Sequence, residues 1–212
     1  MPQAASRGPG RPPAAKAAET RERIIRAARD VFSELGYDAA TFQAIAVRAD
    51  LTRPAINHYF ASKRILWQEV VEQTNSWVIQ QGTEQVLAES SLISQIEGFL
   101  SVAMQADSAD RSAAAFLVTS VLEAQRHPEL RQGESDGVAG TRLFLTAMIN
   151  GAIERGELPA DTEVVPLVEL MVAIFWGMGF YAGFVGDHTE LQTIVNQFRR
   201  IFGAVLGGQA SV

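Results

Sequence analysis

The chain has 212 residues, of which 47% are hydrophobic and 20% charged, a globular composition with room for one large domain or two small ones. It has no cysteine, which excludes disulfides, thiolate nucleophiles and cysteine metal sites and fits a cytoplasmic protein. The net charge of −6 is unevenly spread: residues 1–66 hold 11 Lys and Arg against 6 Asp and Glu, whereas residues 67–212 hold 7 against 18. A basic front on an acidic body indicates that the front binds a polyanion.

The chain begins with a segment that carries no apolar period. Residues 1–19 are rich in Ala, Pro, Gly and Arg, so we expect a disordered basic arm, and no secretory signal is visible there. A helix is predicted from Thr20, as its N-cap, to Leu35, because apolar residues recur every three or four positions. Gly36 stands where a glycine ends a helix.

Two short helices are predicted next, each opened by a threonine N-cap. Thr41 caps the first, which ends before Asp50, a residue type that tolerates the left-handed conformation of a tight turn. Thr52 caps the second, with Pro54 in its first turn, where the missing N–H costs nothing. This second short helix ends near Phe60.

The rest of the chain is predicted as helices separated by Gly, Pro and Asp. Ser62 caps a fourth helix that runs to about Gln81. Further helices are expected near residues 91–106, 110–127, 137–155, 162–185 and 188–206. No segment alternates with the period of a strand. The expected fold is all-α with about nine helices: a helix-turn-helix domain over 20–66 and a ligand-binding and dimerisation domain over 67–212.

Two short helices joined by a tight turn, with another helix behind them, are typical of a helix-turn-helix, whose second helix lies in the major groove. Ile56 and Phe60 are expected to anchor that helix inward. Helix N-termini offer backbone N–H groups to phosphates, and Tyr59 and Lys63 are suited to close a phosphate clamp. The candidate DNA-binding residues are Thr41, Thr52, Arg53, Pro54, Ala55, Asn57, His58, Tyr59 and Lys63.

A set of short motifs spans the three predicted helices and the start of the fourth: Ile24-x-x-Ala27-Ala28-x-x-Val31-Phe32, Gly36-Tyr37, Thr41, Ile45-Ala46-x-x-Ala49 and Tyr59-Phe60-Ala61-Ser62-Lys63-x-x-Leu66. In these motifs residues 20–66 resemble the DNA-binding domain of the TetR family of transcription regulators. Asp50 departs from the family's usual turn glycine, Asn57 from a usual phosphate-contacting tyrosine, and Tyr59 stands where histidine is common. Which of Asn57, His58 and Tyr59 contact bases therefore stays open.

The arm contains Arg7 and Arg11 in the sequence Arg-Gly-Pro-Gly-Arg-Pro-Pro, which is similar to the core of minor-groove AT-hooks. Two interpretations remain for it. A flexible basic arm reaches into a minor groove beside the major-groove site, or it is an ordinary disordered tail. Deletion of residues 1–18, followed by DNA titration, would separate the two.

The stretch Leu170–Gly186 carries no charge over 17 residues. A transmembrane helix needs about 20 apolar residues, and Glu169 and Asp187 flank this stretch, so a buried helix is favoured over a membrane span. Resemblance to the family implies that the last two helices form half of an intermolecular four-helix bundle. Dimerisation is also expected because one small reading helix makes few contacts, whereas two reach both halves of a palindrome.

The helices between residues 91 and 185 are expected to surround a ligand pocket. Aromatic and methionine side chains form adaptable apolar cavities, although the same side chains also fill ordinary cores. The expected ligand is small and apolar, such as a fatty acid, an acyl ester or a lipophilic drug. The candidate lining residues are Phe99, Ala103, Met104, Phe116, Leu117, Phe144, Met148, Phe175, Trp176, Phe180 and Tyr181.

By analogy with the family, we expect a repressor that its ligand releases from a palindromic operator. The alternative is a DNA-binding regulator or activator without a small-molecule inducer. An enzyme is not expected, because the sequence holds no Walker loop, no Gly-x-Ser-x-Gly elbow and no His-Glu-x-x-His. The three histidines lie far apart in the sequence, so neither a metal nor a cofactor is expected.

Overall fold

A computed structural model describes residues 13–87, 91–109, 111–131 and 137–208. Within these ranges the backbone forms nine α-helices, a 3₁₀ turn and a π-helical turn, and no strand, which confirms the all-α prediction. The elements are α1 (Pro13–Ala39), α2 (Phe42–Arg48), α3 (Arg53–Tyr59), α4 (Lys63–Leu87), α5 (Leu92–Ala109), α6 (Ser112–Arg126), η1 (Pro128–Leu130), α7 (Gly137–Glu154), α8 (Val164–Phe180), η3 (Tyr181–Val185) and α9 (His188–Gly208).

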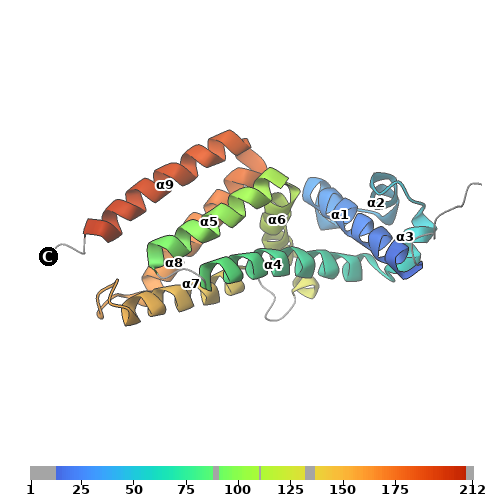
Figure 1. The fold of residues 1–212 in the computed structure, drawn as a ribbon. Helices are drawn as coiled ribbons and strands as arrows, with labels where there is room; N and C mark the ends of the chain where they lie inside the picture. Colours follow the sequence, from blue (N-terminus) through green and yellow to red (C-terminus); the bar gives the residue numbers. More distant parts are fainter. Residues whose placement is uncertain (1–12, 88–90, 110, 132–136, 209–212) are drawn as a thin grey trace, which may run out of the picture.

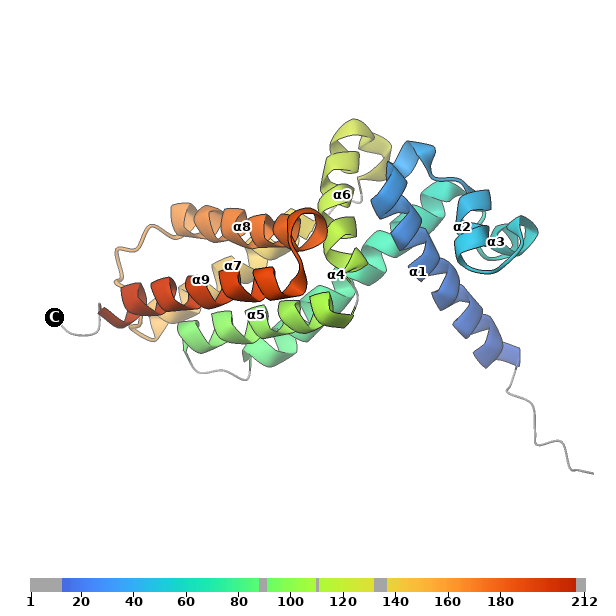
Figure 2. The same ribbon diagram turned by 90° about the horizontal axis from the view of Figure 1, so that it is seen from above.

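The helices form two groups at opposite ends of an elongated molecule (Figures 1 and 2). Helices α1–α3 and the start of α4 form one end, called the head below. Helices α5–α9 form the other end, called the body. The long helix α4 runs from the head into the body, where it packs along α5, and α6 crosses between the two groups. The head and the body are therefore joined by α4 and α6.

The head has its own aromatic core, to which α6 contributes. The rings of Phe32 and Trp67 meet edge to face with centroids 4.9 Å apart, and the Phe116 ring of α6 lies 5.1 Å from that of Trp67. All three side chains are almost fully buried. Phe116 is thus a core residue of the head, away from the other side chains that are expected to contact a ligand. Its ring also attaches α6 to the head, since it packs in the core of the head. Deleting such a buried aromatic side chain costs about 3–5 kcal/mol.

Helix α1 begins earlier than the sequence analysis predicts. It starts at Pro13, so residues 13–19 are helical and not part of a disordered arm. Thr20 does not cap the helix, because its hydroxyl donates to the Lys16 carbonyl oxygen one turn earlier. The alanine-rich sequence here has high helix propensity, and a proline is well tolerated in the first turn. Arg7 and Arg11 lie outside the described residues.

The body is held at its far end by an acidic side chain that caps α5. The carboxylate of Glu157 accepts a hydrogen bond from the Leu92 backbone N–H, with N and O 2.6 Å apart, and it also pairs with Arg155. Burial raises the pKa of Glu157, but the Leu92 hydrogen bond and the Arg155 guanidinium together outweigh it and leave the pKa below its ordinary value. The charged form of Glu157 is therefore the form that the folded state favours.

Replacement of this cap gives a pH-dependent prediction. The folded-state pKa of Glu157 lies below the unfolded value, so its contribution to stability is present at neutral pH and is lost as the pH falls through the folded-state pKa. We expect Glu157→Gln to lower the free energy of unfolding at about pH 7 and to have little effect at about pH 3. Urea unfolding of both proteins at the two pH values measures the difference. An equal loss at both pH values would contradict the proposed cap.

Candidate DNA-reading surface and ligand cavity

The turn between α2 and α3 forms as the sequence predicts. The hydroxyl oxygen of Thr41 accepts from the Ala44 N–H at 3.1 Å, and that of Thr52 accepts from the Ala55 N–H at 3.3 Å, so both threonines are N-caps. Asp50 takes φ +51°, the left-handed conformation expected of it. Two side-chain caps and one left-handed residue thus fix the angle at which α3 leaves α2.

Helix α3 turns one side toward the head core and the other to solvent. Ile56 is fully buried and the capping Phe60 is 2% exposed, so the apolar side is anchored as expected. Ala55 and Tyr59 are half-buried at the edge, where the Tyr59 ring meets that of His58 with centroids 5.4 Å apart. The exposed residues of the α3 cap and helix, called the reading face below, are Thr52, Arg53, Pro54, Asn57 and His58.

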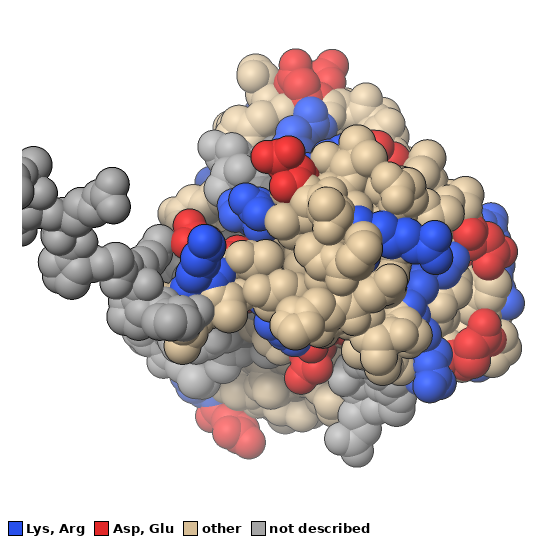
Figure 3. Space-filling view, turned by 90° about the vertical axis from the view of Figure 1, so that its right-hand side faces the viewer, with Lys and Arg blue, Asp and Glu red and all other residues tan. Residues whose placement is uncertain are grey.

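Figure 3 shows the end of the molecule that carries the head, where Lys and Arg side chains, with Asp and Glu side chains among them, surround an uncharged central surface. Two further exposed residues lie near the predicted contacts but were not predicted themselves. They are Gln43 in the first turn of α2 and Arg64 in the first turn of α4. Their position in a first turn is the signal that could have found them, because first turns face the phosphate backbone in this motif.

Lys63 does not project from the head as a phosphate clamp. Its ammonium nitrogen donates to the carbonyl oxygens of Tyr37, Asp38 and Ala40 at 2.6, 3.1 and 3.1 Å, and it lies 4.4 Å from the centre of the Tyr37 ring. An ammonium group has three N–H donors, and all three are used here. Lys63 therefore ties the start of α4 to the turn between α1 and α2, and its expected phosphate contact stays a prediction.

A Lys63→Met variant tests this structural role. The substitution leaves three carbonyl groups without their charged donor. Because a hydrogen bond to a charged group contributes about 1.5–3 kcal/mol to stability, we expect a lower melting temperature. The salt dependence of DNA binding should stay unchanged, because no phosphate contact is lost. Thermal unfolding and DNA titration at several salt concentrations measure the two effects. A weaker salt dependence of DNA binding with an unchanged melting temperature would show that Lys63 contacts a phosphate and has no structural role.

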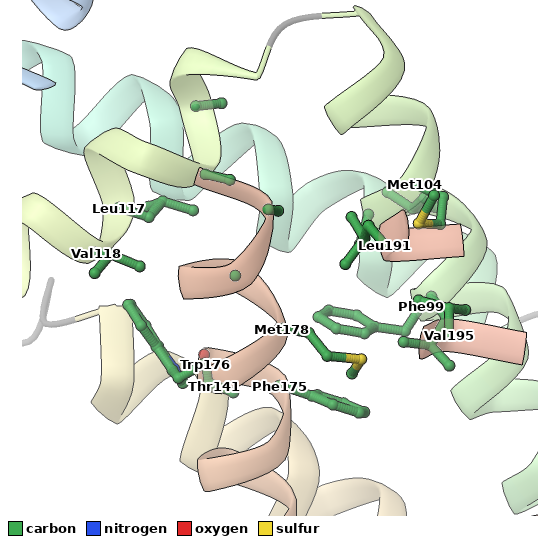
Figure 4. Close-up of a pocket in the computed structure, with 17 residues that line it drawn as sticks. Phe99, Met104, Leu117, Val118, Thr141, Phe175, Trp176, Met178, Leu191 and Val195 are labelled. Carbon is green, nitrogen blue, oxygen red and sulfur yellow. The ribbon is translucent and has the colours of Figure 1, made fainter. Parts of the chain in front are cut away.

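A cavity of about 160 Å³ lies inside the body, between α5, α6, α7, α8 and α9 (Figure 4). Its described lining is apolar apart from the Thr141 hydroxyl and the Trp176 indole N–H. Seen in Figure 4, Trp176 and Leu117 lie to one side of α8, and Phe99 and Leu191 lie to the other. Of the predicted lining residues, those that border the cavity are Phe99, Ala103, Met104, Leu117, Phe175 and Trp176.

Four further predicted contacts lie elsewhere in the body. Phe144 and Met148 pack in its hydrophobic core, where the Phe144 ring lies 5.5 Å from that of Phe99. Phe180 is 50% exposed, on the outer side of α8. Tyr181 lies against Gly186, where an added Cβ would overlap the Tyr181 ring. None of these four side chains borders the cavity, and their expected ligand contacts stay a prediction.

Other lining residues were not predicted. Helix α9 is expected above to serve dimerisation alone, although Leu191 and Val195 on it face the cavity. Most of the other unpredicted residues are small or aliphatic, and such residues give no sequence signal of a cavity wall. The unpredicted lining residues are Leu100, Val102, Ala113, Ala114, Val118, Thr141, Met178, Gly179, Ala182, Leu191 and Val195.

The helix expected to be buried is buried on one side only. Residues Val164–Val185 are long and apolar enough to cross a membrane by length and composition, yet only 22% of the most apolar window is buried. Phe175 and Trp176 pack with the hydrophobic core of the body and border the cavity. The outer side, called the apolar strip below, consists of Leu170, Ala173, Gly177, Phe180 and Phe184.

Comparison with known proteins agrees with both parts of the molecule. A family profile described as "Bacterial regulatory proteins, tetR family" matches residues 24–70, and one described as "Tetracyclin repressor-like, C-terminal domain" matches residues 99–198. The first covers α2, α3 and their supporting helices, and the second covers the helices that line the cavity. The DNA-binding profile therefore matches the head, and the C-terminal profile matches the body that follows it in the chain.

Individual relatives include proteins described as transcription regulators. The chain is 23% identical to the HTH-type transcriptional regulator UidR of Escherichia coli K12 over 163 residues, which are 77% of this chain and 81% of UidR. It is 28% identical to the A-factor receptor protein of Streptomyces griseus over 169 residues, 77% of this chain and 55% of that protein. The solved structure of the ketosteroid regulator KstR2 of Mycobacterium tuberculosis shares the fold, with a TM-score of 0.69 and 22% identity over 89% of this chain and 93% of KstR2.

Proteins with this pair of domains regulate transcription and are not enzymes. They bind operator DNA as homodimers, with the body as the ligand-binding domain. From the two profiles, the relatives and the shared fold, the chain belongs to the TetR family of bacterial regulatory proteins and is a DNA-binding transcription regulator.

Proposed function

We propose that this regulator is a cytoplasmic repressor that binds a palindromic operator as a homodimer and leaves it when a small apolar ligand fills the cavity of the body. The observation that carries the DNA-binding part is the reading face of α3, which is exposed while Ile56 behind it is fully buried. Arg53 and Asn57 on this face are suited to hydrogen-bond base edges, Arg to guanine and Asn to adenine. The threonine caps place backbone N–H groups where phosphates pass.

The dimer would form through α8 and α9. The apolar strip exposes two phenylalanine rings, with Phe180 50% and Phe184 49% exposed, and a contiguous exposed apolar surface is typical of an interaction site. Ala173 and Gly177 are small and exposed in the middle of the strip, which would let two α8 helices approach closely. In the proposed dimer, Ile201 of α9, which is 55% exposed, would add to this interface.

Helix α6 connects the cavity to the head. Ala113 and Leu117 on one side of α6 line the cavity, whereas Phe116 on the other side belongs to the aromatic core of the head. At the start of α6, the Ser112 hydroxyl accepts a hydrogen bond from Arg29 of α1 at 3.1 Å. A ligand that moves α6 would therefore move the head, and a coupling of about 1–3 kcal/mol changes DNA affinity several-fold to more than a hundredfold.

The test begins with fluorescence anisotropy of the full chain on duplexes that carry the palindromes found upstream of its own gene. We expect nanomolar binding to one palindrome, weaker binding to a scrambled duplex, and loss of affinity between about 50 and 200 mM salt. Adding a lipid extract of the source cells should release the operator. If no extract alters binding to the palindrome, the result would instead favour a regulator without an inducer. Equal binding to the palindrome and the scrambled duplex would contradict the proposed recognition of an operator.

A further inference from the structure

The few polar groups at the cavity wall limit what its ligand can be. Within the described residues, no charged side chain borders the cavity, and its only side-chain hydrogen-bonding groups are the Thr141 hydroxyl and the Trp176 indole N–H. In Figure 4 these two side chains lie next to each other on one side of α8. The cavity therefore has one polar corner and an otherwise apolar wall.

We propose that the ligand is an uncharged, compact apolar molecule with a single hydroxyl or carbonyl group, and that this group binds at the corner formed by Thr141 and Trp176. The inference rests on the proposed function, because it names the chemical class of the ligand that the body takes. It narrows the wider class of apolar ligands by excluding ionised fatty acids.

Charge is the first argument. An ionised carboxylate buried without a cation or a sufficient set of donors costs several kcal/mol, and the described wall offers neither. The Arg111 guanidinium is held by the carbonyl oxygens of Ala182 and Gly186. Arg199 lies one turn beyond Val195, donates to the Ser101 hydroxyl at 3.4 Å, and does not line the cavity. An acid would have to leave the cavity along α9 to reach it.

Arg199 nevertheless makes an acidic molecule the main alternative to a neutral ligand. Its Nε is buried and has no hydrogen-bond partner among the described residues. An acidic group placed between α5 and α9 would satisfy that nitrogen. The neutral and the acidic ligand therefore predict opposite preferences between two molecules that differ only in charge.

The direction of the hydrogen bonds at the corner is the second argument. The Thr141 hydroxyl donates to the Gly137 carbonyl oxygen at 2.8 Å, so its oxygen remains as an acceptor. The Trp176 indole N–H is a donor only. A ligand hydroxyl can donate to Thr141 and accept from Trp176, and a ligand carbonyl can accept from Trp176. A carboxylate has no proton to give to Thr141.

Size is the third argument. The cavity volume of about 160 Å³ is close to that of an engineered protein cavity of about 150 Å³ that binds benzene. A single ring with a short substituent fits this volume without rearrangement of the wall. The corner and the volume together favour a small ring or a short chain that ends in an alcohol or a ketone.

The test uses three probes with the same ring: 2-phenylethanol, phenylacetate and ethylbenzene, each at about 5 mM with the full chain near neutral pH. Anything that binds only the folded state raises the melting temperature. We expect 2-phenylethanol to raise it most, ethylbenzene less, and phenylacetate not at all. Thr141→Val, which keeps the shape of the side chain, should weaken 2-phenylethanol about fivefold, equivalent to one hydrogen bond of about 1 kcal/mol, and leave ethylbenzene unchanged. Trp176→Phe should act in the same direction.

Three results would overturn the proposal. The first is binding of phenylacetate at least as tight as that of 2-phenylethanol and abolished by Arg199→Gln, which would assign an acidic ligand. The second is equal binding of 2-phenylethanol to the parent protein, Thr141→Val and Trp176→Phe. The third is no shift with any probe. Operator affinity measured without a probe does not depend on any of these results. If the chain binds the operator but none of the probes, the ligand class proposed here is wrong and the proposed DNA-binding function still stands.

Discussion

Gly177→Glu is expected to convert the dimer into monomers and to lower operator affinity by about 10²–10⁴-fold. Gly177 lies in the middle of the apolar strip, and a Cβ added there meets no heavy atom within 4 Å. The monomer therefore accepts the new side chain, whereas a second copy packed on the strip would bury its charge. The loss of affinity follows because the second head then binds without the effective concentration that the dimer provides.

Analytical ultracentrifugation gives the oligomeric state, and anisotropy on the palindromic duplex gives the affinity. Circular dichroism must show unchanged helix content, since the substitution is designed to spare the fold. Leu122→Glu serves as the matched control, because Leu122 is a 54% exposed apolar residue of α6 outside the strip. A dimeric Gly177→Glu protein with normal operator affinity would rule out the apolar strip as the dimer interface.

Arg53→Ala combined with Asn57→Ala is expected to remove most sequence-specific binding while leaving the dimer and the fold intact. Both side chains are exposed on the reading face, so their removal creates no cavity. One good bidentate base contact discriminates by about 1–3 kcal/mol, so losing two such contacts should lower affinity for the palindrome by roughly thirtyfold to about 10⁴-fold. Affinity for a scrambled duplex should change far less, because phosphate contacts supply most non-specific binding.

The ratio of the two affinities, measured at one salt concentration, is the informative quantity. Arg126→Ala is the control for the lost positive charge, because Arg126 is exposed at the end of α6, away from the reading face. If the double variant weakens both duplexes equally, Arg53 and Asn57 contact the phosphate backbone, and the assignment of α3 as the base-reading helix is wrong.

The head could be predicted from the sequence because its geometry is set by local chemistry. Threonine caps, a left-handed Asp50 and a proline in a first turn each act within a few residues, and each is found where the pattern places it. The departures come from contacts distant in the sequence. Lys63 finds its partners 23–26 residues earlier in the chain, and no local pattern reports those carbonyl groups.

The cavity was less predictable for the same physical reason. Phe99 and Phe116 look alike in a hydrophobic pattern, yet one borders the cavity and the other fills the core of the head. Which of them faces empty space depends on how α5, α6 and α9 pack, and small residues such as Ala113 line the wall without any pattern of their own. The start of α1 was missed because an arginine- and proline-rich beginning obscured the helix propensity of the alanines that follow it.

The most direct test of the account is sedimentation of the full chain with a labelled palindromic duplex at about 50 mM salt, repeated at about 200 mM. The account predicts two chains on each duplex, tight binding at the lower salt, and a steep fall in affinity at the higher. A protein that sediments as a monomer and leaves every duplex free at the lower salt would contradict it.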